Sequence, residues 1–395
     1  MPNFQWYTHE MIKRNLAPFI ARDLRKKMIL LAGPRQVGKT TLAMEIIKKP
    51  GGHYYNWDLS EDRETILTKG FLNDGLVVLD ELHKYDRWKN FLKGIYDKYH
   101  QTLQMIVTGS ARLDIYRRGG DSLFGRHYLY HLHPLTMGEL TRHEILKPEE
   151  FLAAIPSPPD SETYTSLLKW GGFPDPFFAA NEESHARWSL QRKELLVQED
   201  IRDLTQINLL SLVEHLLLLL PKRVGSILSV NSLKEDLQVA HNTITSWLKT
   251  FERLYITYTL DPHTAKLQRA IHKEKKLYLW DWSQIPDESA RFENMVASHL
   301  WKAVQTWRDL GMGDFELKFL RDRDRREVDF CILKNHKPWI LVEAKLSETQ
   351  AAEPLLYFAN RLKVPAFQLT DKKNVERKTA GVFVLSAERF LPLLP

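Results

Sequence analysis

Apolar runs of strand length alternate with amphipathic stretches of helical length over residues 26–140. The runs are KMILLAG (27–33), GLVVLDEL (75–82) and LQMIVTGS (103–110). Each run is short and apolar, as in a buried strand, and the stretches after the first two runs carry apolar residues at helical spacing. Strands that alternate with helices predict a parallel sheet with helices on both faces, which is an α/β fold.

Two further units are predicted beyond this sheet. Residues 145–180 are rich in proline and glycine, which marks a boundary, and residues 181–260 have mostly helical patterns. A helix pattern over residues 289–307 then leads into alternating strand and helix patterns that form a second α/β unit. We therefore expect domain boundaries that give the units 1–145, 146–288 and 289–395.

Length and composition fit a folded cytoplasmic protein of two or three domains. The chain has 395 residues, of which 43% are hydrophobic and 27% are charged. Its single cysteine, Cys331, excludes a disulfide within the chain. The longest apolar run, residues 209–220, is shorter than the ~20 residues of a membrane helix, and the N-terminus lacks a signal-peptide pattern, so we expect no membrane partner. The net charge of +6 is compatible with nucleic acid.

The first apolar run ends in a phosphate-binding loop. Gly33-x-x-x-x-Gly38-Lys39-Thr40 matches the P-loop pattern, and it stands between a strand and a helix as that motif requires. Backbone N–H groups of such a loop converge on phosphates at the positive end of a helix. Lys39 would place its charge beside the β- and γ-phosphates, and the Thr40 hydroxyl would bind Mg²⁺. The predicted ATP-binding residues are Gly33, Pro34, Arg35, Gln36, Val37, Gly38, Lys39, Thr40 and Thr41.

Two carboxylates lie near the end of the second apolar run, at the sheet edge where ligands bind in open α/β folds. We expect Asp80 to hold Mg²⁺, mostly through water, and Glu81 to polarise the attacking water, so that ATP is hydrolysed. The alternative is an N-cap pair for the next helix. At the end of the third run, Ser110 is the predicted sensor of the γ-phosphate, with Thr108 as the second choice.

Two arginines beyond the third run are candidates for stabilising developing charge. Arg112 and Arg126 would act on the ATP site of a neighbouring subunit, in the manner of an arginine finger, or would form ordinary surface salt bridges. The role in trans requires a homo-oligomer, for example a ring.

Residues 232–260 have the order helix, tight turn, helix, strand, which is that of a winged helix-turn-helix. The second helix has a buried apolar stripe and a polar face. That face would offer a DNA major groove the side chains of Asn242, Thr243, Thr245, Ser246 and Lys249. The alternative is a unit that only packs against the nucleotide-binding core or a neighbour, because Lys249 and Arg253 are the only cationic residues of this helix.

Three carboxylates and a lysine of the C-terminal unit suit a hard divalent cation. Glu343 and Lys345 lie two apart on one predicted strand and therefore share a face, and Asp329 lies on the strand before it. Asp329 and Glu343 would be the main metal ligands, with Glu293 added from a helix. Lys345 would activate water for phosphodiester hydrolysis. The alternative is a salt-bridge cluster, since glutamate and lysine on one strand face pair readily.

Motif strings spread over most of the chain carry a family resemblance. They are GPRQVGKTTLA (33–43), VVLDELHK (77–84), TGSARL (108–113), SLFGRHYLYHLHPLTMGEL (122–140), GGFP (171–174), EVDF (327–330) and EAK (343–345). On these strings the chain resembles bacterial and archaeal AAA-type ATPases with a C-terminal PD-(D/E)xK nuclease-like domain of otherwise unknown function. The resemblance implies a P-loop ATPase domain, a helical lid with a winged helix, and a nuclease-like domain. It also implies a second divalent-metal site at Glu293, Asp329 and Glu343.

These observations favour an ATP-hydrolysing DNA-binding protein that moves along, remodels or cuts DNA, branched DNA included. The alternative is an ATP-driven signalling switch that changes its oligomeric state and whose C-terminal domain binds without cutting. The apolar run 209–220 would then be buried in the assembly.

Overall fold

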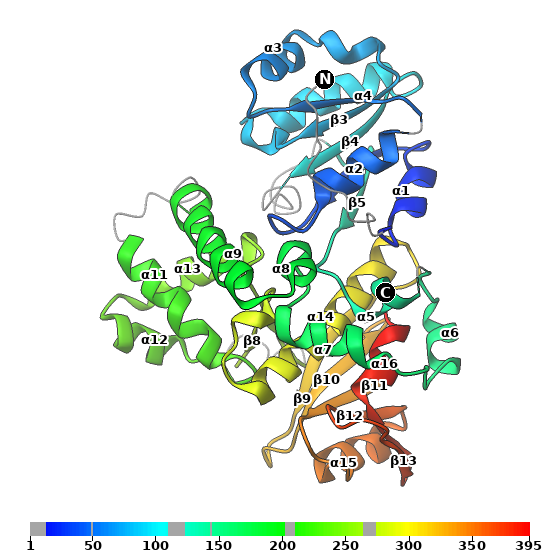
Figure 1. The fold of residues 1–395 in the computed structure, drawn as a ribbon, viewed down its shortest axis with the longest axis vertical. Coiled ribbons are helices and arrows are strands. Elements are labelled where there is room, and N and C mark those ends of the chain that lie inside the picture. The colour runs from blue at the N-terminus through cyan, green and yellow to red at the C-terminus, as the bar shows by residue number, and fades with distance from the viewer. Residues whose placement is uncertain (1–12, 49, 110–122, 143, 202–209, 264–273) are drawn as a thin grey trace.

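The computed structural model describes residues 13–48, 50–109, 123–142, 144–201, 210–263 and 274–395. Figure 1 shows an N-terminal α/β unit in blue and cyan, a helical unit mostly in green, and a C-terminal α/β unit in orange and red. A long helix, α14 (Glu288–Asp309), lies between the first and the last of these units.

The N-terminal unit is a five-stranded parallel sheet in the order β2-β3-β4-β1-β5. Its strands are β1 (Met28–Ala32), β2 (His53–Asn56), β3 (Leu76–Asp80), β4 (Gln104–Gly109) and β5 (His127–His131). Its helices are α1 (Ala17–Asp23), α2 (Lys39–Lys48), α3 (Ser60–Thr68) and α4 (Trp88–Tyr99). Apolar side chains of α1 and α2 cover one face and those of α4 cover the other. The predicted α/β fold with a parallel sheet is therefore confirmed.

The helical unit contains short helices and one small sheet. The helices are α5 (Met137–Thr141), α6 (Pro148–Ala153), α7 (Ser161–Trp170), α8 (Pro174–Ala179), α9 (Glu182–Leu195), α11 (Leu210–Leu219), α12 (Val230–Leu237) and α13 (His241–Arg253). Strand β6 (Thr257–Leu260) pairs antiparallel with β8 (Lys276–Leu279). Helices α12 and α13 followed by β6 have the predicted order, and the winged-helix interpretation of that order stays a prediction.

Helix α11 corresponds to the apolar run 209–220, which the switch hypothesis would bury in an assembly. Val213 and Leu216 are buried in the core, whereas Leu218 is 57% exposed. The helix is therefore covered on one side only. No helix in the described part of the chain is long and apolar enough to cross a lipid bilayer.

The C-terminal unit is a seven-stranded mixed sheet in the order β13-β14-β12-β11-β10-β9-β7. Its strands are β7 (Pro262–His263), β9 (Phe315–Arg321), β10 (Glu327–Lys334), β11 (Lys337–Lys345), β12 (Ala366–Thr370), β13 (Glu376–Thr379) and β14 (Val382–Ser386). Helix α14 packs on one face and α15 (Glu353–Leu362) on the other, and α16 (Ala387–Phe390) joins the side of α14.

A β-bulge in β10 sets the direction of Asp329. Against β9, Val328 pairs with Leu320 and Cys331 pairs with Lys318, so three steps along β10 match two steps along β9. The bulge therefore comprises Asp329 and Phe330. Bulges of this kind turn a side chain out of the regular alternation of a strand.

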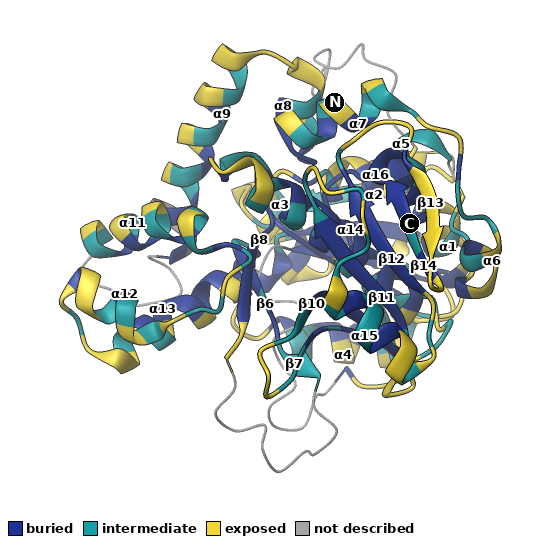
Figure 2. Ribbon diagram, turned by 90° about the horizontal axis from the view of Figure 1, so that it is seen from below, coloured by how far each residue is buried: buried dark blue, intermediate teal, exposed yellow. Residues whose placement is uncertain are grey.

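The helical and C-terminal units share one hydrophobic core. It runs from Leu135 and Met137 through the helical unit to the last residues of the chain, and many of its members lie on α14. Figure 2 shows α14 in the buried colour at the centre of the molecule. Twelve of the 22 residues of this helix are buried, which agrees with its central position.

Candidate functional site

The P-loop has the backbone geometry of a phosphate cradle. Gly33 has φ +151, and a Cβ there would lie 2.4 Å from the carbonyl oxygen of Leu132. Gly38 has φ +95, which L side chains rarely adopt. Lys39 is buried, and its Nζ donates hydrogen bonds to the carbonyl oxygens of Gly33 (3.0 Å) and Pro34 (2.7 Å). The ammonium therefore lies inside the loop that the sequence predicted, between β1 and α2.

Three hydroxyls surround the carboxylate of Asp80. The Thr40 hydroxyl donates to Oδ2 (2.8 Å), and so does the Tyr54 hydroxyl (2.7 Å), while the Thr108 hydroxyl donates to Oδ1. Thr40 and Asp80, predicted as Mg²⁺ ligands, are thus brought into contact. Thr108, the second choice for the sensor, contacts Asp80 directly, whereas Ser110 and Arg112 lie outside the described residues.

Tyr54 is a site residue that the sequence analysis missed. It lies on β2, opposite Val78 of β3, and its side chain reaches Asp80 two residues further along. Burial and the negative charge of Asp80 raise the pKa of the phenol, so Tyr54 stays a donor at neutral pH. The only signal was a four-residue strand, HYYN, which is too short for a periodicity argument.

Glu81 follows the sheet in a strained position. Its φ is +55, which is unusual for a residue other than glycine. Its N–H group donates to the Thr108 carbonyl oxygen and to Asp80 Oδ1 (both 3.1 Å), which fixes the turn. Burial raises the pKa of the Glu81 carboxyl, and the nearby Lys39 ammonium opposes that shift. A carboxylate with a raised pKa accepts a proton more readily, as a general base must.

Arg126 is paired within its own chain. Its guanidinium donates to Asp97 Oδ1 (2.5 Å) and Oδ2 (3.1 Å). It stands just before β5, where His127 pairs with Met28, the first residue of β1. The P-loop follows the other end of β1, so Arg126 does not belong to the ATP site of its own chain. The salt bridge that we considered as the alternative is present, and a role in trans stays a prediction.

A buried ion cluster joins the P-loop to α14. Arg14 donates from Nη1 to the carbonyl oxygen of Val37, inside the P-loop (2.8 Å), and from Nε to Glu139 Oε1 (2.7 Å). The other carboxylate oxygen of Glu139 accepts from Lys302 of α14 (2.6 Å). Arg14, Glu139 and Lys302 are all buried. No sequence pattern indicated these contacts, because residues 14 and 139 are 125 positions apart.

One face of α14 is complementary to the segment after β5. Four polar side chains contact residues 131–139, and they are His299, Lys302, Gln305 and Asp309. Asp309 Oδ2 accepts from the backbone N–H of His131 (2.9 Å), and Lys302 donates to the Thr136 hydroxyl (3.0 Å). Spacings of three and four residues place these side chains along one side of a helix.

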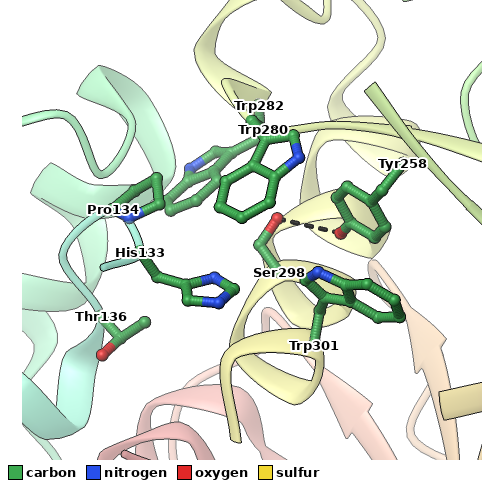
Figure 3. Close-up of a pocket in the computed structure, with 8 residues that line it drawn as sticks. All are labelled: His133, Pro134, Thr136, Tyr258, Trp280, Trp282, Ser298 and Trp301. Atoms are coloured by element: carbon green, nitrogen blue, oxygen red, sulfur yellow. Dashed lines mark hydrogen bonds between the residues drawn. The ribbon is translucent and has the colours of Figure 1, made fainter. Parts of the chain in front are cut away.

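An aromatic junction closes the space between the units. Figure 3 shows Trp280, Trp282 and Tyr258 of the helical unit lining a small cavity together with His133 and Trp301. His133 stacks on Trp280 with ring centroids 4.7 Å apart. The cavity of about 10 Å³ holds about one water molecule, so it is not a substrate pocket.

The predicted C-terminal site residues do come together. Glu343 Oε2 accepts from the backbone N–H of Asp329, and Asp329 Oδ2 accepts from the N–H of Ala344 (both 3.1 Å). The Lys345 Nζ lies 2.8 Å from Glu343 Oε1. Glu293 accepts from the hydroxyl of Tyr278 (2.8 Å). Burial raises the pKa of both Glu293 and Glu343, and the charge of Asp329 adds to each shift.

A second lysine, which the sequence analysis missed, lies inside this cluster. The Nζ of Lys276 on β8 is 2.7 Å from Glu327 Oε1, 3.0 Å from Asp329 Oδ1 and 3.6 Å from Glu293 Oε1. Its side chain is only 2% exposed. Burial lowers the pKa of this ammonium, but the three carboxylates raise it by more, so Lys276 is charged at neutral pH. No group of three His, Cys, Asp or Glu side chains among the described residues has the arrangement of a metal site.

The donor set does not fit a divalent cation in this arrangement. Each carboxylate oxygen of Asp329 and Glu343 already faces a protein N–H or ammonium group. A cation bound by Asp329 and Glu293 would meet the positive charge of Lys276, which contacts both. The predicted metal site thus has its ligands in place, but a lysine lies among them.

Comparisons with known proteins assign the N-terminal unit. Residues 25–141 match a sequence family described as an AAA domain. The N-terminal unit is an AAA-type P-loop domain. Residues 161–285 and 288–390 match two families described as domains of unknown function, DUF8612 and DUF4143. The AAA domain is therefore the part of the chain for which the family matches indicate a chemistry.

The relatives found by sequence comparison are distant. An uncharacterized protein of Mycobacterium tuberculosis is 24% identical over 277 residues, which cover 68% of this chain and 58% of that protein. An uncharacterized protein of Methanocaldococcus jannaschii is 23% identical over 314 residues, which cover 69% of this chain and 64% of that protein. The chain thus spans less than two thirds of either relative.

Solved structures resemble the fold weakly. The Aeropyrum pernix ORC1 protein in complex with DNA has a TM-score of 0.31 at 14% identity, over 71% of this chain and 90% of that one. The Thermotoga maritima RuvB Holliday junction branch migration motor has a TM-score of 0.32 at 16% identity, over 61% of this chain and 86% of that one. Scores this low do not establish a shared overall fold, so the AAA assignment depends on the sequence family and on the P-loop geometry.

Proposed function

We propose that the protein is a Mg²⁺-dependent ATPase whose hydrolysis is coupled to DNA. The observation that carries the ATPase part is the contact of Thr40 with Asp80, beside a P-loop whose lysine already lies inside the loop. These are the groups that hold the nucleotide and its metal ion in P-loop enzymes. The AAA family match over residues 25–141 supports the same conclusion.

Each side chain of the site would have one task. The P-loop N–H groups and Lys39 would bind the phosphates, and Thr40 with Asp80 would hold Mg²⁺, which supplies charge stabilisation when bound. Tyr54 and Thr108 would keep the Asp80 carboxylate in one orientation. Glu81 would orient the attacking water and accept its proton, helped by its raised pKa.

The DNA part of the proposal is supported by helix α13. Asn242, Ser246, Lys249 and Arg253 are exposed, while Ile244, Trp247 and Phe251 of the same helix are buried. A helix anchored by one face that presents amide, hydroxyl and cationic groups on the other suits a DNA groove and its phosphates. The net charge of +6 agrees with such a partner.

The test is ATP turnover by the purified protein with no DNA, single-stranded DNA, blunt duplex and a four-way junction, at low and moderate salt. We expect one DNA form to stimulate turnover, and stimulation to weaken as salt rises because phosphate contacts release counterions. The double variant K249E/R253E should lose the stimulation and keep basal turnover. R187E is the matched control, because Arg187 is an exposed arginine of another helix, α9, with its side chain 75% exposed. Turnover that is indifferent to every DNA form would refute the coupling.

A second candidate function is an ATP-driven switch of oligomeric state. It is favoured by α11, on which Leu218 is 57% exposed beside partly covered leucines. Burial of this face in an assembly would remove apolar surface from water. Mass measurement with and without ATP tests this function, together with L218E. A mass that is unchanged by ATP in the unaltered protein would refute it.

A further inference from the structure

The C-terminal carboxylate cluster has a resident cation of its own. Lys276 is the only lysine in the described chain that contacts three carboxylates, Glu293, Glu327 and Asp329. It does not arrive from the C-terminal sheet. It begins β8, which pairs with β6, and it bridges to Ile227 of the helical unit. The cation and its carboxylates therefore come from different units of the protein.

The carboxylates are built around this ammonium. The bulge in β10 turns Asp329 so that Oδ1 faces Lys276 while Oδ2 accepts from the N–H of Ala344. Glu293 is fixed by the Tyr278 hydroxyl, which comes from the same strand as Lys276. The hydrogen bonds from the Ala344 N–H and the Tyr278 hydroxyl thus orient Asp329 and Glu293 toward the lysine.

A backbone segment of the helical unit also covers the carboxylate cluster. At Gly225, which has φ +72, a Cβ would lie 2.8 Å from Glu293 Oε2. The backbone therefore lies directly against this carboxylate, and its N–H donates to the carbonyl oxygen of Leu277, next to Lys276 (3.2 Å). With the Lys276 ammonium in place, little space is left for a metal ion with its waters, which a hard divalent cation usually retains.

We propose that the Lys276 ammonium takes the place of a divalent cation in this cluster, so that the cluster joins the helical unit to the C-terminal sheet and does not cleave DNA. The carboxylates would repel one another without a cation, and the lysine supplies it from the neighbouring unit. Lys345, predicted to activate water, is then the partner of Glu343 in an ion pair. This inference concerns the C-terminal unit alone and does not depend on the ATPase or on its coupling to DNA.

The first test counts bound Mn²⁺ by electron paramagnetic resonance, without nucleotide, in the unaltered protein, D329N, K276M and K276M/D329N. We expect the unaltered protein and D329N to bind the same number of ions. K276M should bind one ion more per chain, and K276M/D329N should lose it again. The melting temperature of K276M should fall below that of the unaltered protein and rise again with Mn²⁺. K275M is the matched control, because Lys275 is the neighbouring residue and is 48% exposed.

Two results would overturn the proposal. One is an ion bound by the unaltered protein and lost in D329N, and the other is a folded K276M that gains no ion. A second measurement needs no variant of the cluster core: incubation of the unaltered protein and K345A with plasmid DNA and Mg²⁺ or Mn²⁺. The side chain of Lys345 is 33% exposed, so K345A should fold. Cleavage by the unaltered protein that K345A loses would show an active nuclease, and absence of cleavage in both agrees with the proposal.

Discussion

The buried cluster of Arg14, Glu139 and Lys302 allows two substitutions in one ion network to be compared. Glu139→Gln removes the carboxylate that both cations contact, at 2.7 Å from Arg14 and 2.6 Å from Lys302. Lys302→Met removes one cation and leaves the Arg14–Glu139 pair. All three side chains are at most 7% exposed, so water cannot compensate either change. We expect the two variants to differ widely in stability.

The pKa values give the size of the difference. Burial alone would raise the pKa of Glu139, but Arg14 and Lys302 together lower it from 4.5 to about 2, which corresponds to roughly 3 kcal/mol in favour of the folded carboxylate. Burial lowers the pKa of Lys302 from 10.5 to about 8, since one carboxylate offsets it only in part. Keeping Lys302 charged therefore costs roughly 3 kcal/mol, which cancels much of what its hydrogen bonds contribute.

We therefore expect Glu139→Gln to destabilise the protein by roughly 3–5 kcal/mol, the usual cost of an uncompensated buried charge. Lys302→Met should remain within about 1 kcal/mol of the unaltered protein, because a methionine fills the space without a charge to bury. At ~2 °C per kcal/mol for a chain of this size, Glu139→Gln should lower the melting temperature by roughly 6–10 °C.

The assay is thermal unfolding followed by tryptophan fluorescence at pH 7, with ATP turnover recorded below the transition. Lys169→Met is the control, since Lys169 pairs with Glu182 at the surface and lies over the Trp170 ring, so that its loss should cost at most about 1 kcal/mol. The Glu139 contribution is fully present above pH 4.5 and is lost as the pH falls toward 2, because the folded carboxyl has the lower pKa. The gap between the unaltered protein and Glu139→Gln should therefore shrink below pH 4.5. Equal destabilisation by the two substitutions would refute the reasoning.

Four further outcomes test the AAA site and the backbone at Gly225, which lies against the C-terminal carboxylate cluster. Glu81→Gln should lower kcat by at least ~100-fold with ATP binding retained, measured by turnover and nucleotide titration, and retained turnover would mean that another group activates water. The raised pKa of Glu81 should place the acid limb of the kcat–pH profile above pH 4.5, and a limb at or below 4.5 would contradict this. Tyr54→Phe removes a donor to Asp80 and should lower kcat about tenfold, as expected for a hydrogen bond of roughly 1.5 kcal/mol to a charged group; a change below twofold would argue against a positioning role. Gly225→Ala should lower the melting temperature, because its Cβ would lie 2.8 Å from Glu293 at φ +72, and an unchanged value would show that this backbone can move.

Sequence patterns predicted the parts of the fold that are local and periodic. Strands β1, β3 and β4, the P-loop and helix α14 lie where the apolar runs and the glycine spacing indicated. The contact of Thr40 with Asp80 followed from the P-loop pattern and from a carboxylate at a strand end, and the contact of Asp329 with Glu343 followed from their places on two consecutive predicted strands. These predictions depend on local patterns and motif spacing, which can be seen in the sequence itself.

The side chains that the sequence patterns did not predict come from segments distant along the chain. Lys276 contacts Asp329, which is 53 positions away, and it begins a strand of only four residues. Arg14 precedes the first helix and carries no motif. The bulge that turns Asp329 depends on how β10 pairs with β9, which no periodicity of β10 alone contains. Tertiary packing decides these positions, and a single sequence does not display it.

The polar stripe of α14 has a consequence for how such chains change over evolutionary time. The three family matches cover separate stretches, namely residues 25–141, 161–285 and 288–390. Taken alone, these matches would indicate three independent parts. Yet Lys302 and Asp309 are complementary to Glu139 and His131, which belong to the first stretch. A recombination event between two lineages within residues 141–288 would separate polar groups that contact one another in this structure. The segments should therefore be inherited as one set, and hybrids of two relatives should fold only when both sides of this contact come from the same parent.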